Sequence, residues 1–233
     1  MRLQAFLARS AAAPSRRKAE ALIEASRVTV NGETATLGAS VTPEDEVLLD
    51  RRIVQLPSET VSFALNKPAG YLTTLKDEPG KHRPTIRDLM PDFPGLVPAG
   101  RLDAATTGLL ILTNDGRLAN RITHPSNELE KEYLLTVENP ALEESFAALA
   151  AGPALEDGPM YPLRLSHLHR TARETTFHLT IHEGRNRIIR RACAAVGLTL
   201  IHLHRLRVGP VTLGEVPEGR HRYLTIEELG ALG

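Results

Sequence analysis

A polar loop that runs into an unbroken apolar segment is the feature that most constrains this chain. Residues 109–112 read Leu-Leu-Ile-Leu, and turn-forming residues follow them at positions 113–116. This pattern predicts a buried strand over residues 109–113. The loop before it, residues 100–108, begins and ends with glycine and carries a single carboxylate on Asp103. A rigid strand that holds a polar loop often presents a functional group, so Asp103 is the first candidate.

The composition is that of a folded globular protein. The chain has 233 residues, of which 42% are hydrophobic and 24% charged, both near the averages for globular proteins. No apolar run approaches the roughly 20 residues that span a bilayer, and residues 1–10 lack the apolar core of a secretion signal. The single cysteine, Cys193, excludes an intramolecular disulfide and fits a reducing compartment. We therefore expect a cytoplasmic protein without membrane partners.

Positive charge is concentrated in two segments, although the formal net charge is zero. Residues 1–31 carry six Lys and Arg against two Glu, and residues 182–207 carry six Arg against one Glu. The distribution of charge says more about a partner than its sum does. Two separate basic segments predict a polyanionic partner that is contacted at two places.

The first basic segment has the pattern of two short helices followed by a hairpin. Apolar residues at helical spacing predict helices near residues 3–9 and 16–26, and Ser15 is a good N-cap for the second. Residues 28–30 predict a strand that ends in an Asn-Gly turn. Residues 47–50 predict the strand that closes the unit.

Three cations occupy the first turn of the second predicted helix: Arg16, Arg17 and Lys18. The N-terminus of a helix carries partial positive charge, so cations there are mildly unfavourable. A bound phosphate would reverse this effect and would explain the cluster. The alternative is a solvated cluster without a partner.

The rest of the chain alternates strands with scattered helices. Residues 50–60 have the composition of a linker, and residues 76–98 that of a long surface loop. Further strands are predicted at residues 61–65, 133–137, 175–181 and 200–208, and helices at 142–150, 188–196 and 225–229. This order favours an α+β fold on a largely antiparallel mixed sheet.

The second basic segment precedes and enters the helix predicted at residues 188–196. Arg187, Arg190 and Arg191 share one face at spacings that bring like charges together, which lowers helix stability. A polyanion would offset that repulsion. Ile188 and Cys193 lie on the opposite, apolar face, where the thiol is most simply a core group.

Several residues could act on or beside Asp103. Arg101, Thr106 and Thr107 are close to it in sequence and could pair with or hydrogen-bond its carboxylate. A turn aspartate that satisfies loop amides is the commoner role for an isolated Asp. His167 and His169, and likewise His202 and His204, put imidazoles two residues apart, but no cysteine or carboxylate pattern completes a zinc site around either pair.

The loop Gly-Arg-Leu-Asp-Ala-Ala-Thr-Thr-Gly at residues 100–108 closely resembles the signature of pseudouridine synthases. The resemblance implies that Asp103 is a nucleophile or base that detaches uracil from its ribose, after which the base is rotated and rejoined through carbon 5. It implies no metal or organic cofactor. Tyr133 matches the family's Lys-x-Tyr motif and would stack on the target base. Arg190 matches a basic residue that pairs with the catalytic Asp, whereas Ile188 replaces a common Gln.

Residues 1–56 are similar to the S4-like RNA-binding domain, through segments such as Arg27-Val28-Thr29-Val30-Asn31-Gly32. The resemblance implies a small α/β RNA-binding domain at 1–56 and a catalytic domain at 57–233. Lys67, in an Asn-Lys-Pro motif, would support the catalytic loop or touch phosphate. The residues expected to bind RNA are Arg2, Arg16, Arg17, Lys18, Arg27, Lys67, Arg101, Arg185, Arg187 and Arg191.

The domain order resembles that of the bacterial ribosomal RNA pseudouridine synthases of the RsuA/RluB/RluE/RluF group. It implies a monomer that acts on ribosomal RNA, either free and folded or within an assembling subunit. The segments at 124–126 and 156–159 look more like those of the large-subunit members, and this resemblance implies large-subunit RNA, with small-subunit RNA as the alternative. Two other classes stay open. A non-catalytic RNA-binding assembly factor would not need Asp103, and a hydrolase would need a second carboxylate or a metal.

Overall fold

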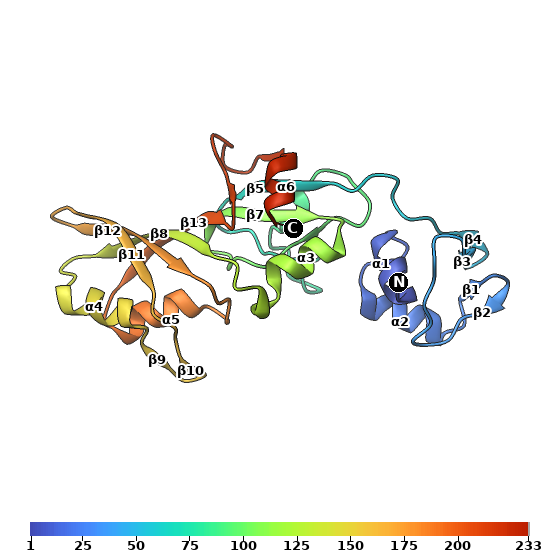
Figure 1. Ribbon diagram of the computed structural model, residues 1–233, viewed down its shortest axis with the longest axis horizontal. Helices are drawn as coiled ribbons and strands as arrows, with labels where there is room; N and C mark the ends of the chain where they lie inside the picture. Colours follow the sequence, from blue (N-terminus) through green and yellow to red (C-terminus); the bar gives the residue numbers. More distant parts are fainter. Residues whose placement is uncertain (233) are drawn as a thin grey trace. The chain divides into compact units, whose positions relative to one another are not determined.

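The computed structural model describes residues 1–232, which form two compact units (Figure 1). The first unit comprises Met1–Val61 with the short segments Pro91–Val97 and Thr113–Gly116. The second comprises Ser62–Met90, Pro98–Leu112 and the chain from Arg117 onward. No helix among the described residues has the length and apolar character to cross a membrane.

The first unit contains the two helices and the hairpin that its sequence predicts. Helix α1 spans Leu3–Arg9 and helix α2 spans Arg16–Glu24, and the Ser15 side chain caps α2 by accepting a hydrogen bond from the Lys18 amide at 3.2 Å. A four-stranded sheet has the order β2-β1-β3-β4. Its strands are β1 (Val28–Val30), β2 (Glu33–Thr34), β3 (Val47–Leu49) and β4 (Arg52–Ile53).

The core of the first unit joins helices and strands. Leu3 and Leu7 of α1, Ala19 of α2 and Val28 of β1 are fully buried in one cluster. Strand β4 lies within the segment predicted as a linker, so that part of the prediction is wrong. Its pairing with β3 extends the sheet by one short strand.

The second unit is built on a mixed sheet whose strand order is β11-β12-β8-β13-β7-β5-β15, with β14 paired to β13 and β6 paired to β7. Strands β11–β12, β12–β8, β8–β13, β13–β14 and β5–β15 pair antiparallel, and β13 pairs with β7 in parallel. The predicted α+β class and largely antiparallel sheet are confirmed. The strands are β5 (Ser62–Lys67), β6 (Val97–Pro98), β7 (Thr107–Thr113), β8 (Lys131–Glu138), β11 (Arg164–Arg170), β12 (Glu174–Ile181), β13 (Leu200–Val208), β14 (Val211–Thr212) and β15 (His221–Tyr223).

Helices and short turns connect these strands. They are α3 (Gly116–Thr123), α4 (Glu143–Ala151), α5 (Ile188–Ala195), α6 (Ile226–Leu232) and two 3-10 turns, η1 (Ile86–Leu89) and η2 (Pro125–Asn127). A separate two-stranded hairpin consists of β9 (Ala154–Leu155) and β10 (Gly158–Pro159). Helix α3 and strand β11 were not predicted.

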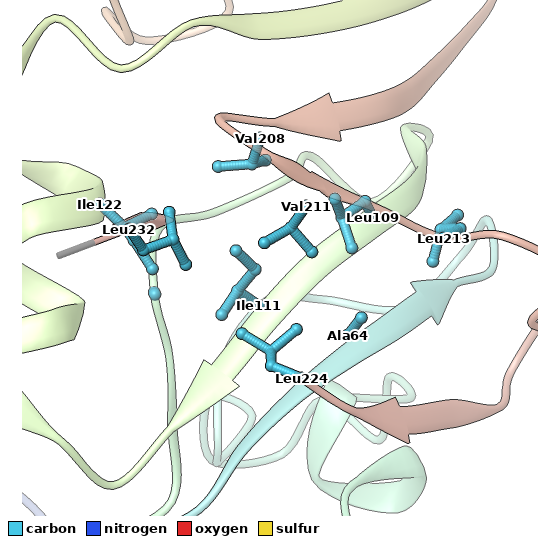
Figure 2. Packing of buried hydrophobic residues seen from close by; sticks show 10 residues of the cluster. Ala64, Leu109, Ile111, Ile122, Val208, Val211, Leu213, Leu224 and Leu232 are labelled. Carbon is cyan, nitrogen blue, oxygen red and sulfur yellow. The ribbon is translucent and has the colours of Figure 1, made fainter. Parts of the chain in front are cut away.

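The apolar run at residues 109–112 lies in a core strand, as predicted. Leu109 and Ile111 of β7 are buried beside Val208, Val211 and Leu224 (Figure 2). Because β7 is fixed on both sides by neighbouring strands, the loop that enters it is held rigidly at one end. That loop carries Asp103.

Candidate active site

A cavity of about 690 Å³ lies in the second unit, at the loop that precedes β7. This volume is within the range of about 300–1,000 Å³ that is typical of small-molecule sites. Asp103, Tyr133 and Arg190, the three predicted catalytic residues, all line it. They come from the 100–108 loop, from β8 and from α5, so the fold brings together side chains that are far apart in sequence.

The carboxylate of Asp103 is paired with two guanidinium groups from the start of α5. Arg187 Nη1 donates to Asp103 Oδ2 at 3.3 Å, and Arg190 Nε lies 3.6 Å from the same oxygen. The Asp103 side chain is 27% exposed, which leaves the carboxylate accessible from the cavity. Arg187 occupies the N-cap position of α5 with a left-handed backbone (φ 49°), a conformation that L residues rarely adopt.

The loop neighbours expected to contact the Asp103 carboxylate have other partners. Thr106 is buried and accepts a hydrogen bond from Arg190 Nη2 at 3.2 Å. The Thr107 hydroxyl pairs with His204 Nδ1 at 2.8 Å, and Arg101 is exposed at the cavity wall. The cations that approach Asp103 therefore come from α5, which is remote in sequence.

Lys67 lies beneath the loop at residues 100–108 and is fully buried. Its ammonium donates to the carbonyl oxygens of Pro68 and Thr106 at 2.9 Å, and to those of Asp103 and Ala104 at 3.3 Å. Burial lowers the pKa of Lys67 to about 8, against the opposing effect of the Asp103 charge. Lys67 therefore supports the loop, and the predicted role in RNA binding does not fit its position.

Two further cations, Lys131 and Arg205, line the cavity beside Tyr133. The sequence analysis assigned a role to neither, although Lys131 is the lysine of the Lys-x-Tyr motif. Arg205 is paired with Tyr133 in the β13–β8 register and is only 4% exposed. Its Nε donates to the Leu109 carbonyl at 2.6 Å. Lys131 Nζ donates to the Leu129 carbonyl at 2.9 Å, and burial together with the Arg205 charge lowers the pKa of Lys131 to about 8. Arg205 follows the apolar Leu203 at the two-residue spacing of one strand face, and this spacing was the available signal for an inward-facing side chain.

Ile188, the departure from the family pattern, is buried and lines the same cavity. A glutamine here would offer an amide to the cavity, whereas isoleucine offers only apolar surface. The Tyr133 side chain is likewise almost fully buried, at 7% exposure. The cavity thus has an apolar part beside its cations, as a site for a planar base requires.

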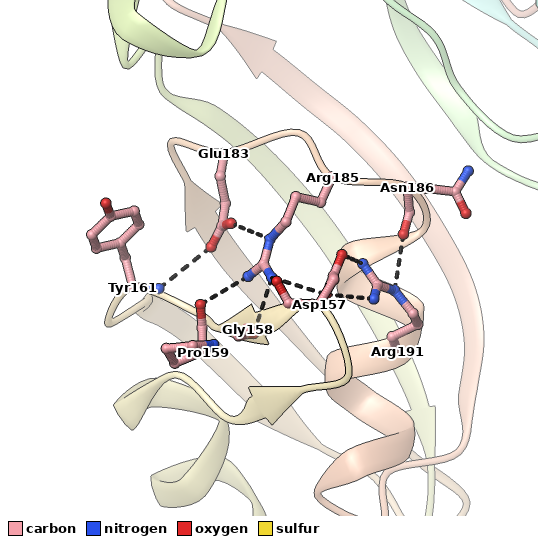
Figure 3. Close-up of polar contacts among 8 residues, drawn as sticks. All are labelled: Asp157, Gly158, Pro159, Tyr161, Glu183, Arg185, Asn186 and Arg191. Atoms are coloured by element: carbon pink, nitrogen blue, oxygen red, sulfur yellow. Dashed lines mark hydrogen bonds and ion pairs between the residues drawn. The ribbon is translucent and has the colours of Figure 1, made fainter.

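Arg185 and Arg191 bind the protein's own hairpin, β9–β10 (Figure 3). Both guanidinium groups pair with the Asp157 carboxylate, Arg185 at 2.9 Å and Arg191 at 2.7 Å. Arg185 also donates to the Gly158 and Pro159 carbonyls at 3.0 Å. Their predicted role in RNA binding does not fit this arrangement, because internal acceptors already satisfy them.

The predicted RNA-binding residues of the first unit are exposed. Arg16, Arg17 and Lys18 form the first turn of α2, which contains no acidic residue. Arg27 pairs with Asp50, its Nε donating to Oδ1 at 2.8 Å, and Arg2 donates to the Gly38 carbonyl. The three cations of α2 are therefore the better candidates for contact with phosphate.

The histidine pairs lie outside any metal-like cluster in residues 1–232. Within that range no three His, Cys, Asp or Glu side chains gather in a way that could hold a metal ion. His167 lies at a bulge in β11, where the register with β12 shifts between Ser166 and His169. The His167 ring packs against the His178 ring at 4.6 Å between centroids.

Comparison with known proteins gives two family matches. Residues 62–195 match the family described as RNA pseudouridylate synthase, and residues 1–47 match the S4 domain. An "Uncharacterized RNA pseudouridine synthase" of Aquifex aeolicus is 42% identical, over all of this chain and 93% of the relative. The "Ribosomal large subunit pseudouridine synthase B" of Bacillus subtilis is 38% identical, over 99% of this chain and 95% of the relative. A crystal structure described as a pseudouridylate synthase covers all of both chains with a TM-score of 0.70 and 36% identity.

Proposed function

Because the chain belongs to the RNA pseudouridylate synthase family and begins with an S4 domain, we propose that it isomerises a uridine of large-subunit ribosomal RNA. The relative in Bacillus subtilis, which bears the name of a large-subunit enzyme, supports this substrate. The observation that carries the proposal is the Asp103 carboxylate, open to the cavity and paired with Arg187 and Arg190. Ribosomal RNA as the substrate would make the cytoplasm its place of action.

Asp103 would act on the uridine after the nucleotide has left its RNA stack. An enzyme that works on a base within folded RNA must extrude that base into a pocket. Tyr133 would then stack on the uracil, and Asp103 would serve as the nucleophile or base that detaches it from the ribose. The bond from the ribose to nitrogen 1 breaks, a bond from the ribose to carbon 5 forms, carbon 5 loses its proton to water, and nitrogen 1 takes up a proton. Uridine and pseudouridine are isomers, so the reaction consumes no second substrate.

The two guanidinium groups would hold the carboxylate in a fixed direction. Charge-assisted pairs of this kind constrain geometry as well as adding energy. Lys67 would fix the loop from below through the four carbonyl oxygens that it contacts. The S4 unit would bind RNA phosphates through Arg16, Arg17 and Lys18. We further propose that the RNA-binding domain ends near residue 56 and that the protein acts as a monomer.

Tritium release tests the assignment. Ribosomal RNA labelled with tritium at carbon 5 of uracil should lose label in the presence of the wild-type protein. Asp103→Asn should release none while binding the RNA as tightly, because the amide keeps the shape of the side chain but not its charge. Equal release by both proteins would remove Asp103 from the mechanism. A non-catalytic assembly factor would bind RNA without any release.

A further inference from the structure

Tyr161 is an exposed aromatic residue at the cavity that contains Asp103. The chain has five Phe, four Tyr and no Trp, so aromatic side chains are scarce. Tyr161 is 72% exposed and lines the cavity from the side of the β9–β10 hairpin. Single exposed apolar residues are common on protein surfaces, so it is the place of this ring at the cavity, and not its exposure alone, that carries the inference.

The backbone at Tyr161 is held by a network that leaves the ring outside. Glu183 accepts a hydrogen bond from the Tyr161 amide at 3.4 Å and another from Arg185 Nε at 2.7 Å. Arg185 in turn binds the Asp157 carboxylate and the Gly158 carbonyl. Figure 3 shows the Tyr161 ring pointing away from this network. The internal contacts of Arg185 thus fix where Tyr161 emerges, which gives this arginine a positioning role.

We propose that Tyr161 stacks on an RNA base adjacent to the uridine that enters the cavity. This inference rests on the proposed function and adds a second base-binding residue to it. Bases unstacked from folded RNA are commonly received on tyrosine rings, because every base presents a flat π-face. Extrusion of one nucleotide breaks stacking with its neighbours, and an exposed ring at the entrance replaces part of that loss.

A cation at the cavity favours RNA over a protein partner. Arg101 is exposed and lines the same cavity as Tyr161, so it is available to a flanking phosphate. Arg187 is exposed as well but is paired with Asp103, and Glu128 and Glu183 also belong to the lining. An aromatic ring beside basic side chains is the usual composition of a single-strand binding surface. The buried Tyr133 and the exposed Tyr161 then have different ligands: the target base inside the cavity and its neighbour at the entrance.

The test is a substitution series at Tyr161, measured with an in vitro transcript of large-subunit ribosomal RNA that carries tritium at carbon 5 of uracil. Tyr161→Phe and Tyr161→Trp keep a flat ring, Tyr161→Leu keeps an apolar side chain without one, and Tyr161→Ala removes both. Tyr223→Leu is the matched control, because Tyr223 is 58% exposed and does not line the cavity. Binding, KM and kcat are measured for each protein, and thermal unfolding shows whether it is folded.

We expect Tyr161→Ala and Tyr161→Leu to bind RNA roughly 5- to 150-fold more weakly, the range that corresponds to the loss of one stacked base. KM should rise with little change in kcat. The loss of affinity should be the same at every salt concentration. Tyr161→Phe and Tyr161→Trp should bind RNA as tightly as the wild-type protein. Wild-type affinity in Tyr161→Leu, or an equal loss in Tyr223→Leu, would overturn the inference. If the wild-type protein releases no tritium, the proposed isomerase activity is refuted. The RNA affinities of the Tyr161 variants would still show whether the ring stacks on a base.

Discussion

Arg190 Nε lies 3.6 Å from Asp103 Oδ2 and has no hydrogen-bond partner within the described part of the chain, although it is buried. An unpaired buried donor costs about 1–3 kcal/mol, so this nitrogen would gain from a small approach of the carboxylate. Catalytic hydrogen bonds are often long before substrate binds and shorten in the complex. The Asp103–Arg190 pair is therefore a contact that RNA binding is expected to tighten.

Replacement of Arg190 should lower turnover more than replacement of Arg187. The Arg190 side chain is 18% exposed against 53% for Arg187, so its charge is less screened by water. Arg190→Gln should reduce kcat on the order of 100-fold, the loss typical of one preorganised donor. Arg187→Gln should reduce kcat less. Single-turnover rates of the two variants compare these effects, and an equal loss would contradict the ranking.

Replacement of Lys67 should loosen the catalytic loop. Lys67→Met removes a buried donor from four carbonyl oxygens, of which those of Asp103 and Ala104 keep the Thr106 and Gly70 amides as donors, so the protein should be destabilised by about 1–3 kcal/mol. Urea unfolding measures the loss, and kcat should fall with it. Lys76→Met is the control, because Lys76 is exposed. If Lys67→Met were as stable as the control, the support of the loop by Lys67 would be refuted.

Lys131 should make stability depend on pH in a defined direction. Burial lowers its pKa in the folded protein to about 8 from an ordinary value of 10.5. Between these values the unfolded chain binds more protons than the folded one, so stability rises with pH. The free energy of unfolding of wild type minus that of Lys131→Gln should be lowest below pH 8 and should increase towards pH 10. Chemical denaturation at several pH values measures the difference, and a constant difference would refute the pKa shift.

The cations of α2 should contribute to the salt dependence of RNA binding. Each phosphate contact adds about 0.7–0.9 to the slope of log affinity against log salt. Charge reversal at Arg16 and Arg17 should reduce the magnitude of that slope by at least about 1.4, from the loss of two contacts. Arg27→Gln should change it less, because Asp50 already pairs with Arg27. Filter binding at several salt concentrations tests this, and an unchanged slope in the double variant would exclude α2 from the RNA interface.

Local sequence patterns predicted most of the long helices and strands, because apolar periodicity and capping residues are read from neighbouring positions in the chain. The run at Leu109–Leu112 is apolar on both faces and forms a buried strand, and Ser15 caps α2 as its side-chain chemistry requires. Helix α3 was missed because its first residue, Gly116, follows turn-forming residues and was assigned to a turn. Strand β11 was missed because its residues are mostly exposed and polar.

The partners of the site residues depend on tertiary structure, and the sequence pattern could not supply them. Arg187 contacts Asp103, which lies 84 positions away in the sequence, and Arg185 contacts Asp157, which lies 28 positions away. A basic run shows that cations are present but does not show which carboxylates lie opposite them. For this reason Arg185 and Arg191 were assigned to RNA, although they bind Asp157. Family motifs named Asp103, Tyr133 and Arg190, and only the fold could place them in one cavity.

The decisive experiment on the proposed activity maps pseudouridines in the ribosomal RNA of cells that lack this protein. We expect a pseudouridine to disappear from large-subunit RNA and to return when the wild-type protein is supplied, but not when Asp103→Asn is supplied. An unchanged set of pseudouridines in the deletion strain would refute the proposed function. Restoration of the modification by Asp103→Asn would contradict the role of its catalytic residue.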